Sequence, residues 1–178
     1  GIFLIYWLFK GRAFLKSQLA RYVYLSPRAL RYRQNLLSYL KGQVGQRPIY
    51  LVTGTDMGFA RVIADYLGIF NGVEASNGFV NLTKENKRDC LIKKFGRDQF
   101  IYIGNSFNDL PVWEASAEAW VCSNNARLLI KVNKLGKPER FFQRCVLQKE
   151  LRDRPLNTYD VVVIGAGAAG LMAAGTAA

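Results

Sequence analysis

The sequence predicts an α/β fold with a parallel sheet, an N-terminal helical segment and a C-terminal fragment of one strand, a turn and a helix. From Pro48 onward, short apolar runs alternate with amphipathic segments, which is typical of β-α units in a parallel sheet. Hydrophobic residues make up 50% of the chain and charged residues 21%, the balance of a chain that buries a core. The length of 178 residues suits one ordinary domain plus a fragment.

We expect a helical segment over residues 1–47. Residues 2–24 are apolar, aromatic and basic with loose helical spacing. Ser26 and Pro27 then resemble an N-cap followed by proline at the first helical position. They predict a second helix that ends at Gly42 and buries one apolar face, formed by Leu30, Leu36, Leu37 and Leu40.

Residues 48–133 form the predicted α/β core. Strands are expected at Ile49 to Thr53, Val73 to Ser76, Phe100 to Gly104 and Ala119 to Cys122. The segment from Asp56 to Leu67 predicts a helix because its apolar residues share one face and Gly68 follows as a C-terminal cap. Further helices are expected from Lys84 to Phe95, from near Asn108 with Pro111 in the first turn, and from Asn125.

The C-terminal part of the chain has a different texture. Residues 134–158 are charged and rich in turn residues, so we interpret them as a linker. Residues 159–178 follow as a separate unit, in which Tyr159 to Ile164 has the composition of a buried strand. The motif GAGAAG and a small-residue helix come directly after that strand.

The charge distribution favours anionic partners. The chain has 25 Lys and Arg against 13 Asp and Glu, and residues 1–50 hold nine bases and no acid. Aromatic residues alternate with these bases, so we expect adhesion to an anionic membrane surface rather than sequence-specific nucleic-acid binding. A solvated basic face is the alternative.

Residue counts exclude several functions. The chain has no histidine, which rules out imidazole bases and His-ligated metal sites. Its three cysteines, Cys90, Cys122 and Cys145, have no C-x-x-C spacing, so we expect free thiols in a reducing cytoplasm. The longest apolar run has eight residues, and a bilayer span needs about 20. We therefore expect a cytoplasmic protein that can lie at the inner face of the membrane.

Three short pieces of the core predict a site at one sheet edge. Thr53 ends the strand LVTGTD, Lys87 lies early in a helix, and GNSFND presents Asn105 and Asp109 after another strand. Ligand sites of open α/β sheets lie at the carboxyl ends of the strands. A hydroxyl, an ammonium and amide or carboxylate oxygens suit a phosphoryl group with Mg²⁺.

At residues 11–132 the chain resembles the haloacid dehalogenase (HAD) superfamily, and more closely the HAD-like phosphatase domain often fused to UbiA-type prenyltransferases. The run GNSFNDLPVW is its most specific part. The resemblance implies a Rossmann-like parallel sheet, hydrolysis of a small phosphomonoester, and a helical cap over the site. It also implies that Thr53 and Lys87 bind phosphate, with Lys84 as the alternative lysine, and that Asn105 and Asp109 hold Mg²⁺.

Two departures from that family count against activity. Asn105 stands where aspartate is more frequent, which weakens metal binding. No Asp or Glu precedes Asp56, so the attacking aspartate of the family's first motif is absent from this chain. Each piece taken alone also has a purely structural interpretation. Thr53 can be a turn or helix-cap residue, Lys87 can be a solvated lysine on a helix, and GNSFND can be a turn that caps a helix.

A second motif lies in residues 159–178. Gly165, Gly167 and Gly170 match G-x-G-x-x-G directly after an apolar strand, where glycines allow close approach to a pyrophosphate. The segment resembles the first β-α turn of two-dinucleotide-fold, FAD-dependent oxidoreductases. The resemblance implies FAD binding in a longer parent only. An apolar strand and an Ala-rich helix used for packing remain the alternative.

Three hypotheses follow: a phosphatase-lineage domain inactive as given, the start of a flavoprotein fusion, or a non-catalytic scaffold or gene-prediction fragment. The HAD resemblance implies an open central slot between the strands at Ile49 to Thr53 and Phe100 to Gly104. Unpaired strand edges are costly. We therefore predict that Asp160 to Ile164 fills this slot as a parallel strand, reached from Ala119 to Cys122.

Overall fold

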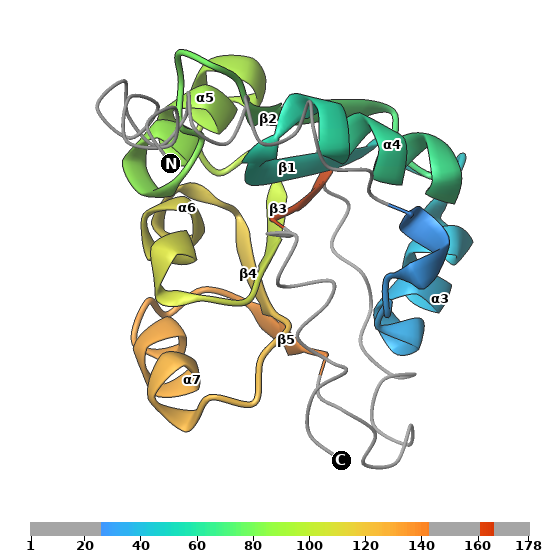
Figure 1. The fold of residues 1–178 in the computed structure, drawn as a ribbon. Helices are drawn as coiled ribbons and strands as arrows, with labels where there is room; N and C mark the ends of the chain where they lie inside the picture. Colours follow the sequence, from blue (N-terminus) through green and yellow to red (C-terminus); the bar gives the residue numbers. More distant parts are fainter. Residues whose placement is uncertain (1–25, 143–160, 166–178) are drawn as a thin grey trace, which may run out of the picture.

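The computed structural model describes residues 26–142 and 161–165, which form one parallel sheet with helices on both faces (Figure 1). The six strands lie in the order β2-β1-β6-β3-β4-β5 and every pair is parallel. This arrangement confirms the predicted α/β class with a Rossmann-like sheet. The strands are β1 (Ile49–Asp56), β2 (Gly72–Ser76), β3 (Ile101–Gly104), β4 (Glu118–Val121), β5 (Glu139–Phe141) and β6 (Val162–Ile164).

The helices follow the predicted β-α order. The α-helices are α3 (Gln34–Gln43), α4 (Met57–Leu67), α5 (Lys84–Phe95), α6 (Leu110–Ala115) and α7 (Ala126–Asn133), and the short 3₁₀ helices are η1 (Pro27–Ala29) and η2 (Phe107–Asp109). Helix α4 begins where the Asp56 side chain accepts a hydrogen bond from Gly58 N, and it ends at Gly68 in the left-handed conformation. The Asn125 side chain caps the N-terminus of α7, where it accepts hydrogen bonds from Arg127 N and Leu128 N.

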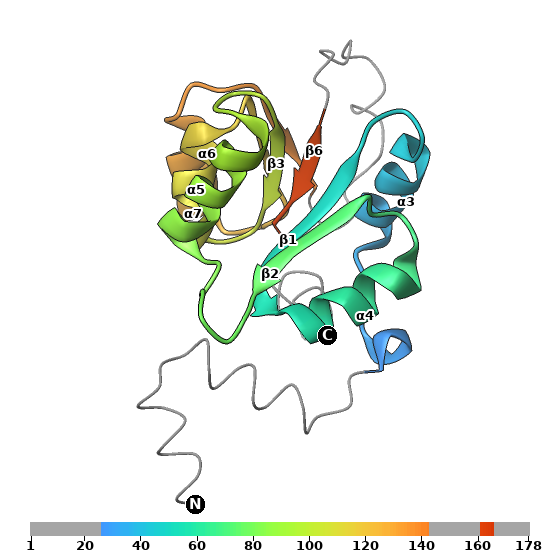
Figure 2. The same cartoon turned by 90° about the horizontal axis from the view of Figure 1, so that it is seen from above.

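The sheet separates two cores (Figure 2). Because side chains alternate along a strand, Ile101 and Ile103 point to one face and Tyr102 to the other. The first face packs against α3 and α4, and we call it the α3 face. The second face packs against α5, α6 and α7, and we call it the α5 face. Strand β6 contributes to both, since Val162 and Ile164 lie on the α3 face and Val163 on the α5 face.

Strand β6 occupies the centre of the sheet. Val162 pairs with Ile49 of β1 and with Ile101 of β3, and Ile164 pairs with Leu51 and Ile103. All three residues of β6 are buried, which suits the continuous apolar run of a central parallel strand. The prediction that this segment fills the slot between the two strands is confirmed.

The predicted helix after Pro27 is wrong in its first half. The chain forms only the short η1, and Leu30 and Arg33 are extended before α3 begins. One local and one distant contact hold this extended link, because Tyr32 donates to Pro27 O and Arg33 Nη1 donates to Phe142 O. Helix α3 then packs Leu36 and Leu40 into the core of the α3 face, across the sheet from α5, which carries Lys87.

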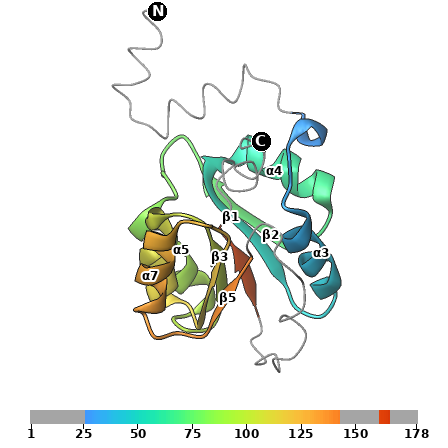
Figure 3. The same ribbon diagram turned by 90° about the horizontal axis from the view of Figure 1, so that it is seen from below.

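The linker prediction for residues 134–158 missed one strand. Residues 139–141 form β5, which extends the sheet beside β4 (Figure 3). The sequence Glu-Arg-Phe lacks the apolar run of a central strand, and β5 is a short edge strand with half-buried residues. The connection to β6 therefore leaves from β5 rather than from the predicted strand at Ala119 to Cys122.

Candidate functional site

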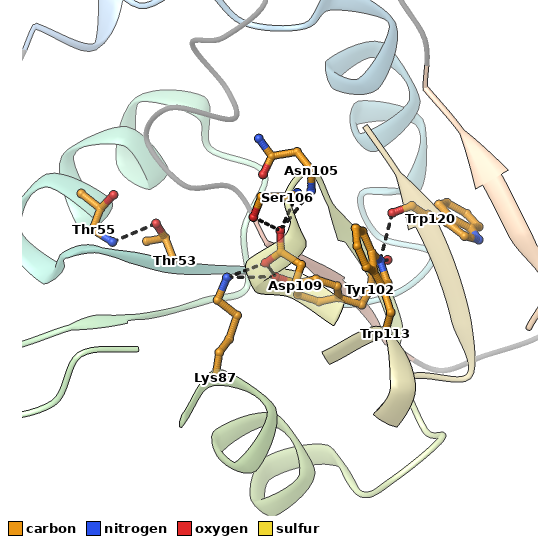
Figure 4. A network of polar contacts seen from close by, with 9 residues as sticks. All are labelled: Thr53, Thr55, Lys87, Tyr102, Asn105, Ser106, Asp109, Trp113 and Trp120. Carbon is orange, nitrogen blue, oxygen red and sulfur yellow. Dashed lines mark hydrogen bonds and ion pairs between the residues drawn. The ribbon is translucent and has the colours of Figure 1, made fainter. Parts of the chain in front are cut away.

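Asp109 is the centre of a polar network at the carboxyl edge of the sheet (Figure 4). It lies in η2, directly after β3, where the sequence Ser106 to Asp109 forms a capping box. Asp109 Oδ2 accepts hydrogen bonds from Asn105 N, Ser106 N and Ser106 Oγ, each at 3.1 Å. The local turn therefore fixes one oxygen of this carboxylate.

The other oxygen of Asp109 binds side chains from two further elements. Lys87 Nζ, from α5, lies 3.0 Å from Asp109 Oδ1, and the Tyr102 hydroxyl, from β3, donates to the same oxygen at 2.7 Å. Lys87 Nζ also donates to the Tyr102 hydroxyl at 3.0 Å. Lys87 is 5% exposed and Asp109 2%, so this is a buried ion pair whose charges are satisfied by hydrogen bonds.

Burial favours the protonated phenol of Tyr102, which the hydrogen bond to Asp109 requires. Desolvation of its phenol, together with the charge of Asp109 and the hydrogen bond to it, raises the pKa of Tyr102 well above the usual value for tyrosine. Tyr102 therefore stays protonated near neutral pH. It can donate to Asp109 while it accepts from Lys87.

Gly104 lets the parts of the network approach one another. A Cβ at this position would lie 2.7 Å from Trp113 Cζ2 and 2.9 Å from Asp109 Cβ. The Trp113 indole donates to the carbonyl oxygens of Tyr102 and Trp120, so it ties β3 to β4 directly below the turn. The glycine of the GNSFND motif is thus explained by close packing.

The predicted phosphate-binding residues lie at the same edge. Lys87 joins Asp109, whereas Lys84 is exposed, so the alternative lysine is excluded from the network. Thr53 is 2% exposed at the end of β1, and its hydroxyl oxygen accepts from Thr55 N at 3.1 Å. Figure 4 shows Lys87 Nζ between Thr53 and Asp109.

The predicted magnesium ligands do not fit a metal site. Five donors already occupy the two oxygens of Asp109, and a carboxylate offers about four lone-pair positions. The side chain of Asn105 turns away from Asp109 (Figure 4). Within residues 26–142 and 161–165, no group of three or more Cys, Asp or Glu side chains could hold a metal ion.

Gly165 is required by Tyr102. A Cβ at position 165 would lie 1.6 Å from the Tyr102 hydroxyl, and Gly165 N donates to Ile103 O at 2.7 Å. Its N–H is therefore part of the sheet and does not face a ligand. Gly167 and Gly170, the other glycines of the predicted FAD-binding turn, lie outside the described residues.

Sequence reasoning missed Tyr102 as a member of the site. It lies in the run IYIG, which is read as an ordinary buried strand. The available signal was alternation: a tyrosine between two isoleucines on a central strand points to the opposite face, where its hydroxyl needs a partner.

Several sequence predictions lie largely outside the described residues. The basic and aromatic segment over residues 1–50 is one of them, since residues 1–25 are not described, and its membrane contact stays a prediction. In the described parts of the chain, no helix is long and apolar enough to cross a membrane. Cys90 and Cys122 are free thiols there, and Cys145 is not among the described residues.

Comparison with known proteins finds similarity to a protein that is itself uncharacterized. An uncharacterized protein, y4nM, of Sinorhizobium fredii (strain NBRC 101917 / NGR234) is 36% identical over 129 residues, which are 72% of this chain and 25% of that protein. No family model matches the chain, and no solved structure matches it. This chain therefore spans about a quarter of the length of the curated relative that it matches.

Proposed function

We propose that this domain is of phosphatase lineage, that it binds a small phosphate ester at the carboxyl edge, and that the 178-residue chain does not hydrolyse it. The observation that carries the proposal is the position of Lys87. Its ammonium group is buried beside Asp109 at the strand ends, with the Thr53 hydroxyl at the same edge. An ammonium and a hydroxyl are suitable donors for phosphate oxygens.

The same network argues against hydrolysis by this chain. In the phosphatase lineage that the chain resembles, a carboxylate oxygen attacks phosphorus, and this oxygen must be free to form a bond. Asp109 is the carboxylate of the described network, and both of its oxygens are held by hydrogen bonds. Gly165, at the end of the central strand, brings no attacking group.

An aryl phosphate assay in the presence of Mg²⁺ tests the absence of hydrolysis. We expect the wild-type chain to show turnover equal to the buffer background. Asp109→Ala and Lys84→Met are the matched variants, because one breaks the network and the other changes an exposed lysine. Turnover that survives Lys84→Met and disappears with Asp109→Ala would contradict the proposal.

A second candidate is the start of an FAD-dependent oxidoreductase. One observation favours it: β6 is a central parallel strand, and the first glycine of G-x-G-x-x-G follows at its carboxyl end. Dinucleotides bind at that position in open α/β sheets. Titration with FAD, followed by its fluorescence, separates the candidates, since the phosphatase-lineage proposal expects no saturable FAD binding by this chain.

A further inference from the structure

Both oxygens of Asp109, the carboxylate of the described network at the carboxyl edge, are occupied by donors. Asp109 Oδ1 accepts from Lys87 and Tyr102, and Oδ2 accepts from three donors of the Asn105 to Ser106 turn. A cation would have to displace the Tyr102 hydroxyl or the Lys87 ammonium. The ring of Tyr102 cannot easily move, because it is completely buried and packs edge-on against Trp113.

Tyr102 can occupy this position only because residue 165 is glycine. The hydroxyl and the terminal ring carbon of Tyr102 lie 1.6 Å and 2.1 Å from the place where a Cβ of residue 165 would be. A residue with a Cβ at the end of β6 would force Tyr102 or β6 to shift. The C-terminal strand and the saturated state of Asp109 are thus parts of one arrangement.

Donors remain at this edge. An ammonium has three N–H groups, and Lys87 uses two of them on Asp109 and Tyr102. The Thr53 hydroxyl accepts from Thr55 N, and among the described residues its own proton has no acceptor. Both side chains are more than nine-tenths buried and lie at the same edge (Figure 4). Buried donors without acceptors are costly, and an oxyanion would satisfy them.

We propose that this edge binds a phosphate-type oxyanion without a divalent cation, with Lys87 and Thr53 as the donors and Tyr102 as the residue that closes Asp109 to metal. The proposal rests on the proposed function and names the metal requirement of its site. Because the charge of Lys87 is already balanced by Asp109, the affinity should be modest, with a Kd for inorganic phosphate on the order of 1 mM.

The test is a titration of the full chain with inorganic phosphate, followed by calorimetry, once with EDTA and once with excess MgCl₂. We expect equal affinities within about twofold in the two buffers, since both oxygens of Asp109 are already occupied by donors. The probe is phosphate itself, and Mg²⁺ alone should give no binding heat.

Three variants show whether the binding is at the proposed site. Thr53→Val keeps the shape and the Lys87 ion pair but removes the hydroxyl, and we expect it to weaken phosphate binding about tenfold. Thr53→Ser restores the hydroxyl and should restore the affinity. Lys84→Met removes a lysine from the same helix outside the network, and it should leave the affinity within about twofold of wild type.

The outcomes separate this proposal from the proposed function. Phosphate affinity that rises more than about tenfold with Mg²⁺ overturns the metal-independent site and leaves phosphate binding intact. Equal loss of affinity in Thr53→Val and Lys84→Met, or no loss in Thr53→Val, overturns the assignment of the donors. Absence of phosphate binding in both buffers overturns this proposal and the proposed function together.

Discussion

Polar groups are buried on both sides of the sheet, but they are treated in opposite ways. In the Asp109 network of the α5 face, each carboxylate oxygen has two or three donors at hydrogen-bonding distance. At the two ends of α3, the buried atoms Arg33 Nε, Gln43 Oε1 and Arg47 Nη1 have no hydrogen-bond partner within the described part of the chain.

The first region is a site whose hydrogen bonds fix its geometry. The second is a region where polar atoms are buried without hydrogen-bond partners among the described residues. A network of satisfied partners fixes one geometry, and removal of Lys87 or Asp109 leaves the other charge uncompensated. The α3 face instead has aromatic packing, because Tyr39, Trp120 and Phe142 contact one another and the Arg140 guanidinium lies over the rings of Tyr39 and Trp120. We therefore expect polar substitutions to matter strongly at the first region and weakly at the second.

The largest effect should come from Lys87→Met. It leaves Asp109 buried without its counter-charge, and we expect a loss of about 3–5 kcal/mol in the free energy of unfolding. Lys84→Met, one turn earlier on the exposed side of α5, should change it by less than about 0.5 kcal/mol. Urea unfolding of both variants measures the contrast, and equal effects would remove the claim that the network is a stabilised unit.

Gly165→Ala should have the next largest effect. Its Cβ would overlap the Tyr102 hydroxyl, so β6 or Tyr102 must shift, at a cost of up to about 3 kcal/mol. A shorter side chain at the partner position, Tyr102→Leu, should reduce the cost of Gly165→Ala in a double-mutant cycle. Gly42→Ala is the control, because nothing lies within 4 Å of a Cβ there and a helix favours alanine. Additive effects of the two changes would argue against the contact.

A matched pair of polar-to-apolar changes compares the two regions directly. Tyr102→Phe removes a hydroxyl that bonds a charged group and should cost about 2 kcal/mol. Gln43→Met removes a buried amide oxygen that has no partner among the described residues, and it should be neutral or stabilising. Thermal and urea unfolding give both values, and a larger loss for Gln43→Met would reverse the comparison.

Alkaline pH should give the smallest effect for each step of the titration. It tests one titratable group from each face of the sheet, Cys122 and Tyr102. Burial raises the pKa of Cys122 to about 11 and the pKa of Tyr102 well above its usual value. In both cases the unfolded state loses its proton first, so the stabilisation is complete below pH 9 and falls as pH rises. We expect a loss of about 1 kcal/mol per pH unit between pH 9 and 11.

Urea unfolding at three pH values from 8 to 11 measures this slope. Cys122→Ala should flatten it between pH 9 and 11, and Tyr102→Phe should flatten it above pH 10. A slope that neither variant changes would assign the alkaline loss to other groups.

The sequence predicts the regular part of this fold well. Apolar runs locate β1 to β4, and capping residues such as Asp56, Gly68 and Asn125 locate the ends of helices, because these signals are local. The prediction of a central position for β6 rests on the HAD resemblance, which implies an open slot there, and on the cost of unpaired strand edges. Strand β5 escapes prediction because a short edge strand needs no apolar run, and its pairing with β4 is decided by the neighbouring strand.

The sequence predicts which residues form the site better than it predicts the hydrogen bonds that these residues make. The motifs bring Lys87 and Asp109 together as expected, and they also place Thr53 at the same edge. The occupied state of Asp109 depends on Tyr102, and the position of Tyr102 depends on Gly165, which is 63 residues further along the chain. Such a dependence involves three separate segments, so no local pattern reveals it.

The central claim is that β6 is an integral strand that supports both faces, and hydrogen–deuterium exchange of the full chain tests it most directly. Gly165 N donates to Ile103 O and Val162 N donates to Pro48 O, both inside the sheet. We predict that peptides covering residues 161–165 exchange as slowly as those covering β3. Exchange of residues 161–165 within seconds, while β3 stays protected, would show a sheet without β6 and contradict the account.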